Sequence, residues 1–356
     1  MIKTYLSILF CFALLLSACT TPTTPAQPSV QHAGSSVVEP VFVDWPVASP
    51  DEKDMNAELF EQMLAEIRTK RMNLRSMLIV RHGHLVMEEY FHSYEANTKN
   101  HVFSITKSVV SALIGIAFDQ GYIKGVDERV LSYFTDRKIA NPSPSKDVMT
   151  LGHLLTMTSG IEWLEANLSY QGLYASPDWT QFMLDKPMAD EPGTRFDYCS
   201  GCTHLLSAII EEATGQDTLE FARQNLFEPL GIQDFAWDLS SEQIAIGGWG
   251  LNLTSRDMAR IGLLYLHKGN WFGRQLISED WVEKTVTPHI DAGDMDYGYL
   301  WWIKPDLDGF AAIGLAGQMI FVSPKHDLVV VTTAEISDHG PIFDLIGRYI
   351  LPAIDD

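Results

Sequence analysis

The segment FSITKSVVSALIGIAFDQG, residues 103–121, contains the pattern on which the fold prediction depends. Its apolar residues occur nearly all round a helix and end at Gly121, which predicts a buried helix. Ser104 and Lys107 form an S-x-x-K motif at the start of this helix, and the i, i+3 spacing places both side chains on one face. A serine hydroxyl is a weak nucleophile until a base removes its proton, and neutral lysine can be that base. Burial would have to lower the lysine pKa from about 10.4 for this role.

The S-x-x-K motif alone does not decide the function. Ser143 and Lys146 have the same spacing within NPSPSKD (141–147). Two prolines predict a loop there, with no helix to align the two side chains. A serine at the start of a helix is also a common N-cap. On this motif alone, nucleophile and N-cap are equally supported interpretations of Ser104.

Strand patterns occur at both ends of the mature chain and helical patterns in between. Residues 76–91 are typical of a β-hairpin that turns at Gly83. Three further strands are expected, at residues 297–303, 318–323 and 327–334. The other expected helices are 57–71, 151–157, 203–214, 217–225, 255–267, 278–285 and about 341–350. We predict an α+β fold, in which helices flank an antiparallel sheet built from both chain ends, about 55–103 and 290–352. A mainly helical domain, about 104–289, is inserted, and the cleft between the two parts is the natural place for a site.

Six stretches, taken in chain order, resemble the serine β-lactamase and penicillin-binding-protein superfamily over about residues 75–350. They are FSITKS (103–108), LGHLLTMTSGI (151–161), PGTRFDYCS (192–200), GWGLNLTSRDMARIG (248–262), YGYLWW (297–302) and IGLAGQMIFVSP (313–324). The resemblance implies that Ser104 attacks a carbonyl, that Lys107 takes the serine proton and that Tyr198 shares in proton transfer. It also implies an oxyanion hole formed by the backbone N–H groups of Ser104 and Gln318, which would stabilise charge in the transition state.

Two departures from the family pattern bear on the substrate. The second motif, usually Tyr-x-Asn, is Tyr198-Cys199-Ser200 here, and the third motif is Leu315-Ala316-Gly317, without the usual cation. Ser200, Leu315 and Gly317 are therefore the expected pocket residues, and the pattern is similar to the esterase and 6-aminohexanoate-dimer hydrolase branch. Glu162 and Glu165 do not resemble the deacylating glutamate motif of class A β-lactamases.

These features predict a serine hydrolase that cleaves a small ester or amide through an acyl-enzyme, with no metal or cofactor. A β-lactamase or D,D-carboxypeptidase is the alternative among enzymes, and a catalytically silent lipoprotein that binds peptidoglycan or a protein is the alternative among binders.

The sequence contains no G-x-S-x-G, G-x-G-x-x-G, P-loop or zinc signature. Its 25 Lys and Arg against 46 Asp and Glu, a net charge of −21, oppose nucleic-acid binding.

The first 50 residues are expected to lie outside the folded domain, which is assigned to 51–356. Residues 1–18 have a lysine followed by a short apolar run, as in a signal peptide. Leu16-Ser17-Ala18-Cys19 resembles the lipobox of bacterial lipoproteins, which implies lipidation of Cys19 and a tether over 19–50 that is rich in Pro, Thr and Ser. The residue after the cysteine is Thr20, and in this the sequence resembles lipoproteins that are sent to the outer membrane. We therefore expect the protein to be anchored in the outer membrane and to face the periplasm.

Two cysteines remain in the folded part, Cys199 and Cys202. Their C-x-x-C spacing resembles a redox motif, but it lies beside Tyr198 and lacks a thioredoxin-like context. We expect free, packed thiols, with a local disulfide as the second possibility and metal or redox chemistry as the least favoured.

Overall fold

The structure is a computed structural model that describes residues 45–355. The proposed signal peptide and Cys19 lie outside the described residues. The last residues of the expected tether are described, and they contact the sheet. Trp45 is buried, and the Leu85 N–H donates to the Pro46 carbonyl at 2.8 Å. The folded part therefore begins before residue 51. Within 45–355, no helix is both long and apolar enough to cross a bilayer.

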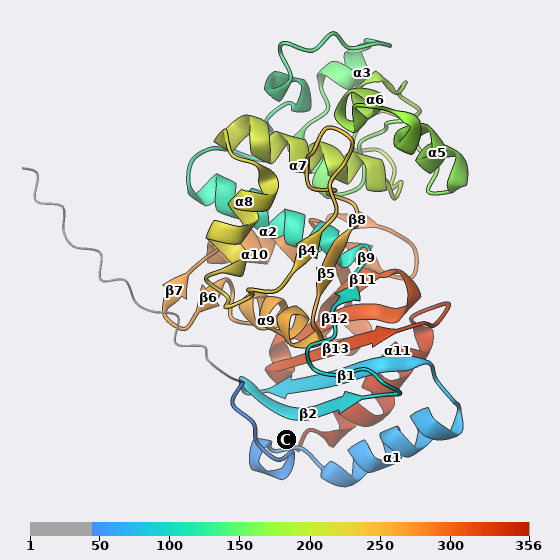
Figure 1. The fold of residues 1–356 in the computed structure, drawn as a ribbon, viewed down its shortest axis with the longest axis vertical. Coiled ribbons are helices and arrows are strands. Elements are labelled where there is room, and N and C mark those ends of the chain that lie inside the picture. Colours follow the sequence, from blue (N-terminus) through green and yellow to red (C-terminus); the bar gives the residue numbers. More distant parts are fainter. Residues whose placement is uncertain (1–44, 356) are drawn as a thin grey trace, which may run out of the picture. The chain divides into compact units, whose positions relative to one another are not determined.

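The core of the fold is an antiparallel sheet of eight strands, in the order β2-β1-β13-β12-β11-β10-β9-β8 (Figure 1). Their bounds are β1 Leu74–Arg81, β2 His84–Tyr90, β8 Ile290–Asp291, β9 Asp296–Tyr297, β10 Trp302–Lys304, β11 Gly309–Gly314, β12 Gln318–Ser323 and β13 Leu328–Ala334. Strands β1 and β13 pair along their whole length, from Leu74 opposite Ala334 to Arg81 opposite Leu328. The predicted sheet built from both chain ends is confirmed.

The outer face of the sheet is covered by the terminal helices. These are α1 (Ala57–Thr69), α11 (Gly340–Leu345) and the π-helical turn Ile346–Ile350. Their apolar residues form one core with the side chains that β1, β12 and β13 direct to that face. Because helices cover both faces, β13 (LVVVTTA) is buried at every position and has no charged residue.

The remaining helices follow the first strands in the chain. They are α2 (Ile105–Asp119), α3 (Pro144–Asp147), α4 (Leu151–Leu155), α5 (Asn167–Ala175), α6 (Trp179–Asp185), α7 (Ser200–Thr214), α8 (Thr218–Ala222), α9 (Ser255–Leu266) and α10 (Glu279–Thr285). A small sheet joins β3 (Asn100–His101), β5 (Leu251–Leu253) and β4 (Ala236–Trp237), and β6 (Asn270–Trp271) pairs with β7 (Arg274–Gln275). Most of these helices are stacked above the sheet (Figure 1).

Helix α9 lies on the sheet, although the sequence placed residues 255–267 in the helical part. It packs against β13, β12 and β1. At Gly262 the two backbones come so close that a Cβ atom would lie 2.5 Å from Val329 Cγ1 and 2.8 Å from Ile320 Cγ2. The boundary drawn at residue 289 was therefore wrong for this helix. Its glycine permits close packing that an amphipathic pattern alone does not reveal.

Helix α2 is the central helix of the molecule. Every side chain from Ile105 to Ala117 is buried, as its nearly uniform apolar pattern predicts. It packs on α7 and on β11, so it contacts both the helical part and the sheet. The start of this helix, where Ser104 and Lys107 lie, is thereby held at the junction of the two parts.

Candidate active site

Ser104 and Lys107 are brought together at the start of α2. Ser104 occupies the N-cap position, yet its side chain makes no capping hydrogen bond. The Lys107 Nζ atom lies 2.8 Å from Ser104 Oγ and donates to the Gly248 carbonyl at 2.6 Å. The serine hydroxyl therefore faces the lysine amine instead of the helix backbone, which removes the N-cap interpretation.

The Lys107 amine is enclosed by protein. The side chain is 1% exposed, and burial lowers its pKa to about 7, against the opposing charge of Glu165. A substantial fraction of the amine is therefore neutral near pH 7 and has a free lone pair. Such an amine can accept a proton from a hydroxyl 2.8 Å away.

The second S-x-x-K copy has a structural role. Residues Pro144–Asp147 form the short helix α3, where a loop was expected, because Pro144 fits the first turn and Ser143 caps it through its Oγ. The Lys146 Nζ atom donates to three backbone carbonyls, at 3.1, 2.8 and 2.6 Å, those of Ala140, Leu184 and Lys186. The Lys146 amine is thus bound to carbonyls instead of Ser143, and it links the segment at Ala140 to the segment at 184–186.

Tyr198 lies beside the Ser104–Lys107 pair, at the residue before the N-cap of α7. The Lys107 Nζ atom is 4.8 Å from the centre of its ring, and Trp302 stacks on the ring at 5.9 Å. Burial raises the pKa of the Tyr198 hydroxyl above 10, although a hydrogen bond with Ser104 opposes this rise. The hydroxyl therefore keeps its proton at neutral pH and can donate it.

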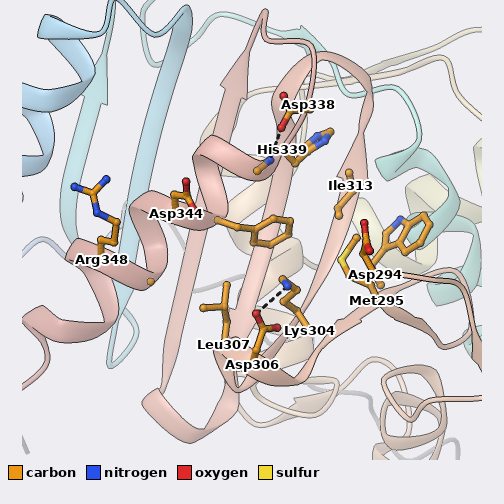
Figure 2. Close-up of a pocket in the computed structure, with 14 residues that line it drawn as sticks. Asp294, Met295, Lys304, Asp306, Leu307, Ile313, Asp338, His339, Asp344 and Arg348 are labelled. Carbon is orange, nitrogen blue, oxygen red and sulfur yellow. Dashed lines mark hydrogen bonds and ion pairs between the residues drawn. The ribbon is translucent and has the colours of Figure 1, made fainter.

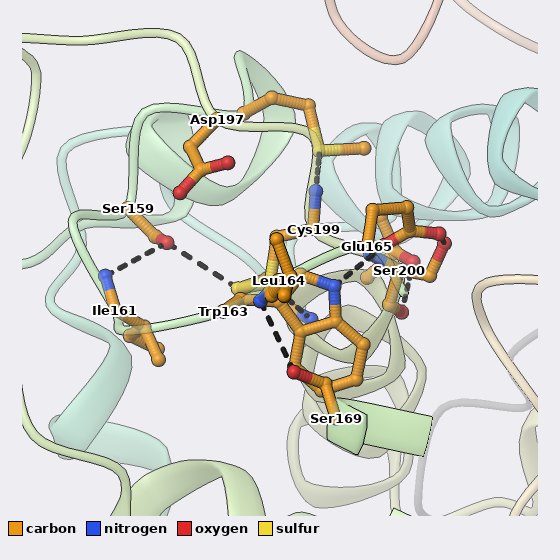
Figure 3. Close-up of a disulfide and its surroundings, with 12 residues drawn as sticks. Ser159, Ile161, Trp163, Leu164, Glu165, Ser169, Asp197, Cys199 and Ser200 are labelled. Atoms are coloured by element: carbon orange, nitrogen blue, oxygen red, sulfur yellow. Dashed lines mark hydrogen bonds between the residues drawn. A yellow bond between two sulfur atoms is a disulfide. The ribbon is translucent and has the colours of Figure 1, made fainter. Parts of the chain in front are cut away.

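Glu165 is a residue of this region that the sequence did not identify. One carboxylate oxygen accepts the backbone N–H of Ser200 at 3.0 Å and the Trp163 indole N–H at 2.5 Å (Figure 3). The other oxygen accepts the Ser200 and Tyr170 hydroxyls. Ser200, the residue that departs from the Tyr-x-Asn pattern, is thus held by a carboxylate from a distant loop. Residue spacing gives no signal of this contact.

The third motif connects β11 to β12. Gln318 is 1% exposed and pairs with Gly314, and its side chain amide donates to the carbonyls of Leu315, Ala316 and Ala334. A Cβ atom on Gly314 would collide with the Val102 carbonyl, so this strand end touches the segment before Ser104. The two predicted oxyanion donors therefore belong to adjoining segments.

The two expected pocket residues of the third motif, Leu315 and Gly317, differ in exposure. Leu315 is 66% exposed, so its side chain does not form a buried pocket wall. Gly317 is buried and has a φ of 89°, and a Cβ atom there would collide with Ile336 and Ala334. Glycine is required at this position for the backbone and its packing.

Cys199 and Cys202 form a disulfide in the first turn of α7 (Figure 3). Their Cα atoms are 5.2 Å apart, within the range that a disulfide spans. The expectation of free thiols was wrong, because the i, i+3 spacing at a helix start brings the two sulfur atoms together. Both cysteines are buried in the core, and Cys199 directly follows Tyr198.

Arg256 and Arg348 are two candidates for the cation that the third motif lacks, and both form ion pairs with glutamates. Arg256 binds Glu88 through two nitrogens at 2.7 Å, and Arg348 binds Glu66 at 2.8 Å.

A cavity of about 670 Å³ lies between β10, β11 and α11 (Figure 2). Its lining includes Arg348, Trp302 and Lys304, and Lys304 binds Asp306. Among residues 45–355, no cluster of His, Cys, Asp or Glu is arranged to hold a metal ion.

Comparison with known proteins shows which proteins this chain is similar to. The 6-aminohexanoate-dimer hydrolase of Paenarthrobacter ureafaciens is 22% identical over 84% of this chain and 81% of its own length. A Bacillus anthracis protein assigned as a 6-aminohexanoate-dimer hydrolase has the same fold, with a TM-score of 0.72, 21% identity, and coverage of 87% of this chain and 86% of that one. A family VIII carboxylesterase also shares the fold, with a TM-score of 0.69 and 16% identity. The match covers 86% of this chain and 99% of the carboxylesterase chain.

The relatives named above are hydrolases of amides or esters. The family model described as Beta-lactamase matches residues 58–351, which is most of the chain. The sequence motifs, the eight-stranded antiparallel sheet and this match agree on one assignment. The chain belongs to the Beta-lactamase family.

Proposed function

We propose that this protein is a serine hydrolase that cleaves an ester or amide through an acyl-enzyme intermediate. The observation that carries the proposal is the 2.8 Å approach of the Lys107 amine to Ser104 Oγ, on a buried helix that lowers the lysine pKa to about 7. A serine hydroxyl attacks a carbonyl efficiently when a base lies within hydrogen-bond distance and has a pKa near the working pH.

Acylation then proceeds in three proton transfers. Neutral Lys107 accepts the Ser104 proton as Oγ bonds to the carbonyl carbon, and the backbone N–H groups of Ser104 and Gln318 hold the resulting oxyanion. When the tetrahedral intermediate collapses, Tyr198 donates its proton to the leaving oxygen or nitrogen, and Lys107 reprotonates Tyr198. Water then repeats the sequence in reverse, which releases the acid and regenerates Ser104.

The surroundings of Ser104 favour an ester or linear amide over a β-lactam. The third motif has Leu315 where a cation would hold the lactam carboxylate, and the candidate substitutes Arg256 and Arg348 bind Glu88 and Glu66. The hydrolase and carboxylesterase relatives support the same substrate class. A silent binding protein is the less economical interpretation, since binding alone does not require a lysine buried against a serine hydroxyl.

We also propose that the enzyme is anchored by lipid at Cys19 and works at the outer membrane, facing the periplasm. The support is the sequence LSAC (16–19) after a short apolar run.

Replacement of Ser104 tests the assignment of the nucleophile. Ser104→Ala should lower kcat/KM for p-nitrophenyl butyrate by at least about 1,000-fold, and adding Lys107→Ala should cost little more, because the two act as a unit. Ser143→Ala is the matched control from the second S-x-x-K copy and should retain turnover. Loss of activity in the control with full activity in Ser104→Ala would overturn the assignment.

The pH dependence tests the role of Lys107. Because only the neutral amine accepts a proton, kcat/KM should rise about tenfold per pH unit below 7 and level off above it. The Glu165 charge opposes the lowering of this pKa, so Glu165→Gln should move the midpoint to lower pH. A profile that is flat from pH 5 to 9, or a midpoint that moves to higher pH in Glu165→Gln, contradicts this role.

Parallel assays of p-nitrophenyl butyrate and nitrocefin test the substrate class. The absence of one charge-assisted hydrogen bond typically costs about 1.5–3 kcal/mol, which is roughly a 10- to 150-fold loss. We therefore expect measurable ester turnover and weak or absent nitrocefin turnover. A higher kcat/KM for nitrocefin than for the ester would favour the β-lactamase alternative.

Fractionation of cells tests the anchor. The wild-type protein should be recovered with outer membranes, and Cys19→Ala should move it to the soluble periplasmic fraction. Mass spectrometry of the mature N-terminus should show a lipid on Cys19; an unmodified terminus at another residue would disprove this part of the proposal.

A further inference from the structure

Glu165 has an unusual set of partners. The Ser200 N–H, the Ser200 hydroxyl, the Tyr170 hydroxyl and the Trp163 indole N–H all donate to it, two to each oxygen. A carboxylate has about four lone-pair sites, so these four donors fill them. Glu165 has little capacity left to orient a water molecule or to accept a hydrogen bond from a substrate. Its remaining influence on a ligand is through its charge.

That charge is not neutralised by a protein cation. All four donors are neutral groups, and in the part of the chain from 45 to 355 no lysine, arginine or histidine pairs with Glu165. By contrast, Glu66 binds Arg348, and Glu88 binds Arg256. The Glu165 side chain is exposed to solvent, and its charge raises the pKa values of both Lys107 and Tyr198. A negative charge without an ion-pair partner therefore lies within electrostatic reach of Lys107 and Tyr198, and only the partly protonated Lys107 amine opposes it.

Two aromatic residues, Trp163 and Tyr170, contact the same carboxylate, and further rings pack on Tyr170. Tyr170 contacts Trp163, with ring centres 5.5 Å apart, and Trp249 at 5.1 Å, and Tyr174 extends the group by stacking on Tyr170 at 6.1 Å. Trp249 directly follows Gly248, whose carbonyl accepts from Lys107. Tyr170 and Trp249 are only half-buried, and Tyr174 is 55% exposed. We name Trp163, Tyr170, Tyr174 and Trp249 the aromatic wall.

From this arrangement we infer that the site selects substrates that carry a permanent, alkylated ammonium group, held against the aromatic wall beside Glu165. The electron-rich faces of Tyr and Trp attract cations, and a carboxylate nearby adds to the attraction. A primary ammonium would need acceptors for its N–H groups, whereas the lone pairs of Glu165 are already occupied. An alkylated ammonium needs charge and apolar contact only. This inference rests on the proposed hydrolase function and names its substrate class.

The test compares esters that differ only in charge. One pair varies the acyl group, p-nitrophenyl 4-(trimethylammonio)butyrate against its carbon isostere p-nitrophenyl 5,5-dimethylhexanoate. A second pair varies the alcohol, acetylcholine against 3,3-dimethylbutyl acetate. In at least one pair the wild-type enzyme should prefer the cation by about tenfold or more in kcat/KM. Glu165→Gln should lower this ratio severalfold, and Glu162→Gln, which changes an exposed glutamate three residues away, should leave it unchanged.

The aromatic contribution is tested separately at Trp249. Trp249→Leu should lower the cation-to-isostere ratio, and Trp249→Phe, which keeps an aromatic face, should retain most of it. The ratio is unaffected by a general loss of folded enzyme, because both esters are measured on the same sample.

The two proposals fail in different ways. If the wild-type enzyme hydrolyses neither ester of either pair, the hydrolase proposal fails. If it hydrolyses the neutral esters but shows no preference for the cation in either pair, or if Glu165→Gln leaves the preference intact, the hydrolase stands and the inference about the ammonium group is overturned.

Discussion

The structure depends on one constraint, the burial of the Lys107 amine next to the hydroxyl of Ser104. An ammonium ion is costly to remove from water, and the equilibrium shifts toward the neutral amine instead. The surroundings supply the hydrogen bond that a buried amine still needs, from its N–H to the Gly248 carbonyl. Helix α2 must therefore be covered on all sides, by the sheet and by α7, for this chemistry to exist.

Two opposing influences set the base strength of that amine. Burial lowers the pKa of Lys107, and the Glu165 charge raises it again, with the result near 7. Glu165 also fixes Ser200 and accepts hydrogen bonds from the side chains of Tyr170 and Trp163. Tyr198, which stacks on Trp302, contacts the same amine through its ring. The Glu165 carboxylate thus has two effects: its charge raises the pKa of Lys107, and its hydrogen bonds hold Ser200, Tyr170 and Trp163 in place.

The sequence predicted those parts of the molecule that local patterns determine. The apolar run at 103–121, the hairpin at 76–91 and the spacing of Ser104 and Lys107 are local signals, and the structure contains each of them. Strand β11 was missed because GFAAIG consists of glycine, alanine and few β-branched residues, which are weak strand formers. The contact between Glu165 and Ser200 joins segments 35 residues apart, and no local pattern specifies it.

The central claim is that Ser104 forms the covalent intermediate. The most direct measurement is peptide mass spectrometry after reaction with a fluorophosphonate, which bonds to an activated serine and remains attached. The account predicts one phosphonyl group per chain, on the peptide that contains Ser104, and labelling that becomes faster as the pH rises through about 7. A label on another serine, or an unlabelled folded protein, would contradict the account.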